Sequence, residues 1–264
     1  MRCRKNNMKF RLLKTGHLSA AENMSIDEAV LAHIASGESS PTLRFYGWTP
    51  PAISIGYFQS LEEEVDLAAC KKYGVDYVRR LTGGGAVFHD TEITYSIHIP
   101  EKINLVPNGI LESYNKICGG IIKGLSLLGL NIQFVPLNDL IVMHDGAPRK
   151  ISGNAQTRKS GIILQHGTIL LKVDVDKMFE LLKVPSEKLK GKLIEDVKQR
   201  VTGLSPVLGL EVSFDEALNV LEKGFRQEFS GVEFAEGELT ESEKKLTLKI
   251  AQEKYASDEW NKKR

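Results

Sequence analysis

Apolar residues recur at helical spacing in two long stretches of the first half of the chain. Ser19 and Glu22 have the spacing of a capping box, which predicts a helix over about residues 19–36. One face of that helix is apolar and carries Ala20, Met24, Leu31 and Ile34. A second helix is predicted over residues 108–130, where Gly129 marks its end.

Strand-like segments lie between and after these helices. The alternation is cleanest over residues 91–99, and apolar runs bounded by Gly or Pro predict further strands at 43–46, 52–57, 76–80, 132–143 and 161–173. Beyond Asp174 the pattern is mostly helical, near 175–183, 186–200, 213–229 and 240–256. This order predicts an α+β fold, in which a mixed or antiparallel β-sheet core is flanked by helices and followed by a helical C-terminal tail.

The expected division is one large domain over residues 1–235 and a helical tail over 236–264. With 264 residues the chain can bury a sizeable core, and it shows no internal repeat or long linker. The weakest joint is the Gly-containing segment 230–237. The tail could pack on this domain or on another chain.

Charge and cysteine content exclude several classes of protein. Lys plus Arg number 35 against 34 for Asp plus Glu, which argues against nucleic acid as a partner. The three cysteines, Cys3, Cys70 and Cys118, have no CxxC spacing, so neither a disulfide framework nor a zinc site is expected. The basic N-terminus lacks the apolar run of a signal peptide, and no segment is apolar over the ~18 residues of a membrane span. We therefore expect a cytoplasmic protein.

The most informative segment is the run Arg79-Arg80-Leu81-Thr82-Gly83-Gly84-Gly85 between two predicted strands. Three consecutive glycines lose much backbone entropy on folding, so they indicate a positive φ or close approach of the backbone. The two arginines suggest that an anionic group approaches. The pattern is neither G-x-G-x-x-G nor a P-loop, so a nucleotide would be held in another way.

A second polar stretch surrounds Lys150 and His166. Lys150 opens a strand-like segment and could hold a carboxylate or acyl phosphate, or be a surface lysine at a hairpin end. His166 could act as a base, although a structural histidine is the simpler interpretation. Asp139 is the candidate ligand for Mg²⁺, and Asp27 on the first helix is interpreted as a buried scaffold carboxylate. Of the pair His89-Asp90, one residue is expected to bond the glycine loop and the other to help hold a cation.

Taken together, these residues resemble those of the lipoate-protein ligase family, within the group that includes biotin ligases and octanoyl transferases. The resemblance is carried by three motifs in order: Arg79-Arg80-x-Thr82-Gly83-Gly84-Gly85-Ala86-Val87-Phe88-His89-Asp90, Asn138-Asp139-Leu140, and Lys150-Ile151-x-Gly153-x-Ala155. It implies ATP-dependent activation of lipoate to lipoyl-AMP, with Mg²⁺, and transfer to a lysine of a lipoyl acceptor domain. No covalent enzyme intermediate is implied.

The resemblance also implies roles for individual residues. Lys150 would be catalytic. The adenylate would contact Arg80, Gly85, Ala86, Val87, Phe88 and Lys150; lipoate would contact Gly83, Gly84, Gly85, His89, Lys150, Gly153 and His166; and Asp139 would bind the metal.

Two departures from the family pattern matter. Octanoyl transferases of this fold use a cysteine nucleophile shortly before the segment that here reads Asn138-Asp139-Leu140, and this chain has none there, although Gln156 and Gln165-His166-Gly167 look like transferase residues. The chain is also short for a single-chain ligase and resembles split forms, in which a small accessory subunit supplies the last domain. Octanoyl transfer to the same acceptors is the alternative, and a binding module without turnover is a third.

Overall fold

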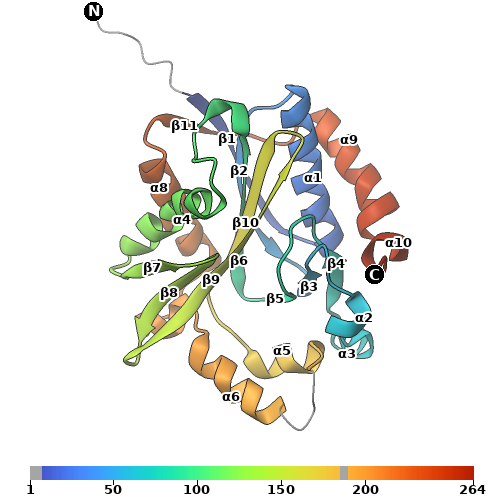
Figure 1. Cartoon of the computed structure of the whole chain (residues 1–264), viewed down its shortest axis with the longest axis vertical. Coiled ribbons are helices and arrows are strands. Elements are labelled where there is room, and N and C mark those ends of the chain that lie inside the picture. The colour runs from blue at the N-terminus through green and yellow to red at the C-terminus, as the bar shows by residue number, and fades with distance from the viewer. Residues whose placement is uncertain (1–7, 185–189) are drawn as a thin grey trace, which may run out of the picture.

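A mixed sheet of eight strands forms the centre of the computed structural model, which describes residues 8–184 and 190–264 (Figure 1). The strands are ordered β11-β1-β2-β6-β10-β9-β8-β7. Their bounds are β1 Met8–Leu18, β2 Thr42–Trp48, β6 Glu92–Pro100, β7 Ile132–Val135, β8 Asp139–His144, β9 Ala147–Lys159, β10 Ile162–Leu170 and β11 Val232–Glu236. β1 pairs in parallel with β2 and β11, and the other pairs are antiparallel. The predicted α+β class is confirmed.

Two edges of this sheet differ from the sequence prediction. β1 was not predicted, and segment 230–237, interpreted as a weak joint, contributes β11, which pairs with β1 in the register Met8↔Val232. A pairing between residues so far apart leaves no local signal in the sequence. The single strand predicted over 132–143 is instead the hairpin of β7 and β8.

Helices cover both faces of the sheet. α1 (Ala20–Ser36) and α9 (Glu241–Ile250) lie on one face, and α4 (Ile110–Ser126) and α8 (Phe214–Glu228) lie on the other (Figure 1). Ser19 and Glu22 form the predicted capping box at the start of α1. α4 and α8 approach closely because small residues meet where they cross: a Cβ at Gly224 would lie 2.2 Å from the carbonyl oxygen of Gly120.

A smaller sheet carries the glycine loop. Its order is β4-β3-β5, with β3 Ala52–Ile55, β4 Asp76–Arg79 and β5 Val87–His89, and α2 (Leu61–Glu64) and α3 (Leu67–Tyr73) connect β3 to β4. The shorter elements that follow β6 or β10 are η1 Glu101–Ile103, α5 Val175–Leu181, α6 Lys190–Arg200 and α7 Leu204–Leu208. The helix predicted over 186–200 is thus seen from Lys190 onward, and residues 186–189 lie outside the described ranges. The glycine loop runs from β4 to β5.

The C-terminal tail packs on this same chain. After α9, a π-helical turn at Ala251–Tyr255 and the short α10 (Asp258–Asn261) place the end of the chain beside β4. Tyr255 is buried, and its hydroxyl donates to Glu28 on α1 at 2.8 Å. The tail therefore packs against α1 and against β4 of the smaller sheet.

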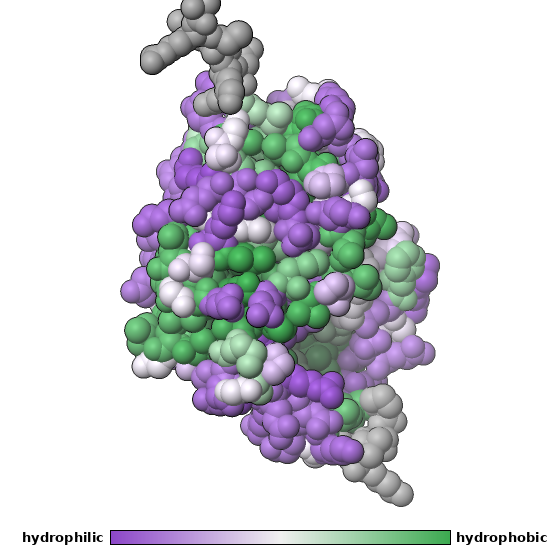
Figure 2. Space-filling view, turned by 60° about the vertical axis from the view of Figure 1, so that its left-hand side comes forward, coloured by the Kyte–Doolittle hydropathy of each residue, from purple (hydrophilic) through white to green (hydrophobic). Residues whose placement is uncertain are grey.

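The surface is mostly polar but has an apolar area. Figure 2 shows apolar side chains gathered on the side where α4 and the β7–β8 hairpin come forward. Exposed apolar residues on these elements include Ile110, Leu111, Val135, Leu137 and Met143. Within residues 8–184 and 190–264, no helix is long and apolar enough to cross a membrane.

Candidate active site

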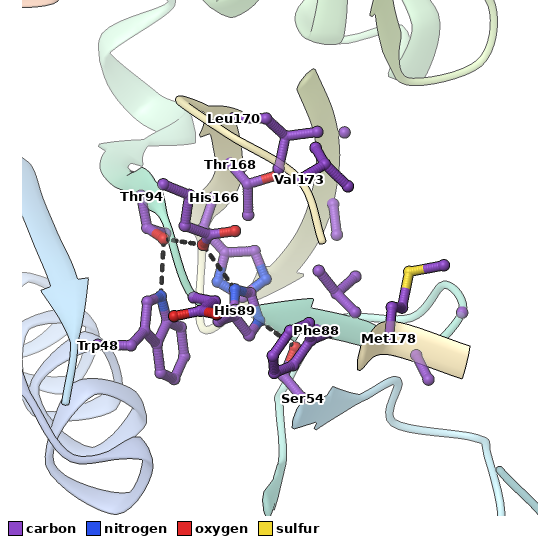
Figure 3. Close-up of a pocket in the computed structure, with 18 of the residues that line it drawn as sticks. Trp48, Ser54, Phe88, His89, Thr94, His166, Thr168, Leu170, Val173 and Met178 are labelled. Carbon is purple, nitrogen blue, oxygen red and sulfur yellow. Dashed lines mark hydrogen bonds and ion pairs between the residues drawn. The ribbon is translucent and has the colours of Figure 1, made fainter. Parts of the chain in front are cut away.

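A cavity of about 320 Å³ is lined by the interior strands β6, β10 and β9 of the large sheet, by the smaller sheet with its glycine loop, and by α5 and α6 (Figure 3). That volume falls within the usual range for small-molecule sites. Apolar side chains form much of its wall, among them Met24, Phe88, Leu170, Val173, Met178, Val197 and Val201. Polar groups enter it from the glycine loop and from β9 and β10. The cavity thus combines an apolar interior with a few placed polar groups.

The glycine loop is shaped by backbone geometry. Gly84 has a φ of +97°, a conformation that favours glycine. The loop lies directly on Gly56, where a Cβ would come within 1.9 Å of the Gly84 carbonyl oxygen. Around Gly85, by contrast, a Cβ would meet nothing within 4 Å. The predicted need for positive φ and close approach is therefore confirmed at Gly84 and Gly56, and Gly85 leaves room for a ligand.

Both arginines of the motif are buried, and their guanidinium groups donate to backbone carbonyl oxygens of the protein. Arg80 donates to the carbonyl oxygens of Ser54, Gly83 and Gly85 and to the hydroxyl of Thr82 at 2.8–3.1 Å. Burial lowers the pKa of Arg80 to about 10, so it stays charged at neutral pH. Its donors are thus already used by the loop and by β3, and the expected contact of Arg80 with a phosphate stays a prediction.

Lys150 lies at the cavity wall because β9 bulges. Neighbouring residues Leu140 and Ile141 of β8 pair with Ser152 and Lys150, so Ile151 is the extra residue. In a regular strand Lys150 and Gly153 would face opposite sides, and the bulge re-aims the lysine. Its ammonium lies over Gly153, where a Cβ would be 2.9 Å from Nζ.

That ammonium forms an ion pair. Nζ of Lys150 is 2.7 Å from Oδ1 of Asp139, and both side chains are about a third exposed. The predicted metal ligand Asp139 is thus engaged by a cation. Among the described residues, no group of three or more His, Cys, Asp and Glu could hold a metal ion. A Mg²⁺ at Asp139 would depend on substrate phosphates for most of its ligands.

A buried ionic network lies beneath the cavity floor. Asp27 accepts from Arg44 at 2.8 Å and from Ser96 at 2.7 Å. Burial alone would raise the pKa of Asp27, but Arg44 and His166 outweigh it and hold the pKa well below its ordinary value. The interpretation of Asp27 as scaffold is consistent with this geometry.

His166 connects the network to the glycine loop. Its Nε2 is 2.7 Å from the hydroxyl of Thr82, and its Nδ1 is 3.8 Å from Oδ2 of Asp27. Burial lowers the pKa of His166, while Asp27 acts in the opposite sense. His166 does line the cavity, yet both its nitrogens are directed at protein groups.

The sequence did not predict a second set of hydrogen-bonded side chains, which lies in the cavity wall. Nε2 of His89 is 2.7 Å from Oγ of Ser54, and Nδ1 is 2.6 Å from Oε1 of Glu92 (Figure 3). Trp48 stacks on the His89 ring, with centroids 4.0 Å apart. Neither residue of the pair His89-Asp90 bonds the glycine loop directly, because His89 bonds Ser54 and Glu92 and Asp90 pairs with Lys177 on α5 at 3.2 Å. Serine in a strand gives no sequence signal of such a chain.

Most of the candidate residues meet in this one cavity. Its lining includes Arg80, Gly84, Gly85, Ala86, Val87, Phe88, His89, Lys150, Gly153 and His166. Gly83 and Asp139 do not line the cavity, although Asp139 forms an ion pair with Lys150, which does.

Neither of the two cysteines that the structure describes lines the cavity. Cys70 on α3 and Cys118 on α4 are buried. Burial raises the pKa of Cys70 to about 11 and that of Cys118 to about 12, so both are thiols at neutral pH. Cys3 lies outside the described residues. Among the residues that the structure describes, a cysteine-based acyl intermediate therefore has no candidate in the cavity wall.

Comparison with known proteins identifies the family. A family model described as the lipoyl protein ligase A/B catalytic domain matches residues 19–226. The chain belongs to this family. An octanoyltransferase LipM from Anoxybacillus flavithermus is 39% identical over 97% of this chain and 98% of its own. The LipM of Bacillus subtilis is 36% identical over the same shares.

Solved structures of family members show the same fold. A bi-partite lipoate protein ligase from Thermoplasma acidophilum, studied with its E2 lipoyl domain, superposes with a TM-score of 0.85, 32% identity and 96% coverage of both chains. A lipoate-protein ligase A bound with ATP gives a TM-score of 0.78 and 30% identity, covering 96% of this chain and 98% of that one. The expected lipoate-ligase fold is confirmed, and the relatives include both transferases and ligases.

Proposed function

We propose that this protein transfers an octanoyl or lipoyl group to the amine of a lysine on a lipoyl acceptor domain. The observation that carries the proposal is the mostly apolar cavity with Lys150 at its wall. Burying an eight-carbon chain there contributes about 0.8 kcal/mol per CH2. The Lys150 ammonium would then contact the acyl carbonyl oxygen and stabilise the negative charge that develops on it when the acceptor amine attacks.

The first candidate donor is an octanoyl thioester on a carrier protein. The names of the curated relatives favour it, since octanoyltransferases at 36–39% identity span nearly the whole chain. This donor requires neither ATP nor Mg²⁺. The apolar wall of the cavity suits a plain alkyl chain.

The second candidate is ATP-dependent ligation through lipoyl-AMP. It is favoured by the solved ligases of the same fold and by the lack of a cysteine among the described cavity residues. The open space at Gly85 and the backbone of Ala86, Val87 and Phe88 would then face the adenylate. ATP supplies the energy to activate the acid.

A separate accessory subunit is a further proposal for the ligase route. Its support is the likeness to a ligase described as bi-partite, of which one chain is covered over 96% of its length. We expect such a subunit to raise the rate of ligation and to have no effect on transfer from a thioester.

One set of reactions separates the two donors. The protein is incubated with a lipoyl domain and either octanoyl-carrier thioester, or lipoate with ATP and Mg²⁺, and the intact mass of the domain is recorded. Mass gain with the thioester alone supports the transferase route, and gain only with ATP supports the ligase route. Each reaction is repeated with a lipoyl domain whose target lysine is replaced by arginine, which should gain nothing.

A further inference from the structure

Ser54, His89 and Glu92 form a hydrogen-bonded chain in the cavity wall. The hydroxyl of Ser54 is 2.7 Å from Nε2 of His89, and Nδ1 of His89 is 2.6 Å from a carboxylate oxygen of Glu92. With Nδ1 donating to the carboxylate, Nε2 is left to accept the hydroxyl proton. These are the distances and roles of a nucleophile, its base and the group that orients the base.

Neighbouring side chains hold the hydrogen-bonded residues Ser54, His89 and Glu92 in place. Thr94 donates to the same oxygen of Glu92 at 2.8 Å and accepts from Trp48, whose ring stacks on His89. The three members of the chain are only 2–4% exposed, yet each lines the cavity. A polar chain that is shielded from bulk water but open to a ligand cavity suits chemistry on a bound substrate.

A cationic side chain lies beside Ser54, and apolar side chains line the same cavity. Nη1 of Arg80 lies 3.2 Å from Oγ of Ser54, so a cation stands beside the oxygen that would become nucleophilic. Phe88 and Met178 line the same cavity as Ser54 and His89, and they offer apolar surface to an alkyl chain (Figure 3). Ser54 lies within strand β3, so its position is fixed by the sheet.

We propose that Ser54 is an acyl-carrying nucleophile, and that it takes the place of a cavity cysteine in transfer from a thioester. This inference rests on the proposed acyl transfer. Oγ of Ser54 attacks the acyl carbonyl carbon and its proton passes to His89. The C–S bond breaks, and the leaving thiolate takes that proton. The acceptor lysine amine then attacks the serine ester, the C–Oγ bond breaks, and the amine proton returns to Oγ through His89.

The test looks for the acyl-enzyme before any acceptor is added. The whole protein is mixed with p-nitrophenyl octanoate, and intact mass and peptide mapping follow. The expected result is one octanoyl group on the peptide containing Ser54, with a burst of nitrophenol close to one per protein. Ser54→Ala should lose both signals. Ser113→Ala, which alters a buried serine outside the cavity, should keep them.

Two further variants keep the test decisive if Ser54→Ala folds poorly. Ser54→Cys should form an adduct that neutral hydroxylamine removes, because the bond is then a thioester. Glu92→Gln should slow the burst at least 10-fold. If wild-type protein modifies a lipoyl domain but never carries acyl on Ser54, the inference is wrong and the proposed function stands. If no acyl donor is used in any assay, the proposed function itself fails.

Discussion

Lys150 and Asp139 are joined by a 2.7 Å ion pair on neighbouring strands, and the pair depends on a bulge at Ile151. The bulge turns Lys150 to the same face of β9 as Gly153. Because Gly153 has no side chain, the lysine ammonium can lie over it. The geometry of the cavity wall therefore depends on one extra residue in β9 and one glycine.

We predict that Gly153→Ala impairs acyl transfer by displacing Lys150. The new Cβ would stand 2.9 Å from Nζ and 3.0 Å from Cε, so the side chain must move. Loss of one well-placed donor costs about 100-fold in rate, and we expect a loss approaching that value. The measurement is the rate of acceptor modification at saturating donor. Gly231→Ala is the control, because a Cβ there meets nothing within 4 Å; equal rates for both variants would contradict the account.

The buried Asp27–Arg44 pair predicts a specific response to pH. The folded-state pKa of Asp27 lies below its ordinary value of 3.8, so its contribution to stability is present above that value and is lost as the pH falls toward the folded pKa. In Arg44→Leu burial would dominate and raise the pKa of Asp27. Stability should then fall as the pH rises from about 4 to 7, the reverse of the wild-type trend.

The same variant should also lose about 3–5 kcal/mol of stability near neutral pH, since an unpaired buried charge remains. Urea unfolding between pH 3 and 8 measures both effects. Arg149→Leu, which removes only a surface ion pair with Asp145, should change stability by less than about 1 kcal/mol. A parallel pH dependence of the Arg44 variant and wild type would show that Arg44 does not control Asp27.

Asn261, the last residue of α10, ties the C-terminal tail to Arg79 at the end of β4, where the glycine loop begins. Its side-chain oxygen accepts from the backbone N–H of Arg79 at 2.8 Å, and its backbone oxygen accepts from the Arg79 guanidinium at 2.8 Å. We predict that Asn261→Ala costs about 1–3 kcal/mol, because it leaves a buried N–H unpaired. Thermal unfolding measures the loss. Lys262→Ala, which removes an exposed pair with Asp258, should be nearly neutral, and an equal effect would contradict the proposed tie.

A protein without cysteine should remain active. Cys70 and Cys118 are buried thiols outside the cavity, and burial raises the pKa of each. We expect the triple variant Cys3→Ser, Cys70→Ala, Cys118→Ala to modify a lipoyl domain within about 5-fold of the wild-type rate once its folded fraction is matched. This factor allows for the roughly 1 kcal/mol effects of core substitutions. A loss of more than 100-fold in folded protein would assign the chemistry to a thiol.

Local patterns in the sequence predicted the parts of the fold that depend on neighbouring residues. The capping box at Ser19 and the alternation over residues 91–99 both correspond to observed elements, α1 and β6. The strands β1 and β11 were missed because their pairing joins the two ends of the chain. Such long-range partners leave no periodic signal.

The candidate site was only partly predictable, because its motifs are local in the sequence whereas most of its contacts join distant residues. Motif resemblance located Lys150 and the glycine loop, both of which reach the cavity. It could not show that Arg79 and Arg80 turn inward to backbone carbonyls, since only the folded chain brings Gln59 to Arg79 and the glycine loop back onto Arg80. Nor could it join Ser54 to His89, which lie on paired strands of the smaller sheet.

The most direct measurement is the intact mass of a purified lipoyl domain after incubation with this protein and each acyl donor, with and without a small accessory subunit. We expect a gain of one octanoyl or lipoyl group on the acceptor lysine with at least one donor. Lys150→Ala should reduce the rate at least about 100-fold while the protein stays folded. An unchanged acceptor mass under every combination, with the donors shown to be competent by a known family enzyme, would contradict acyl transfer by this protein.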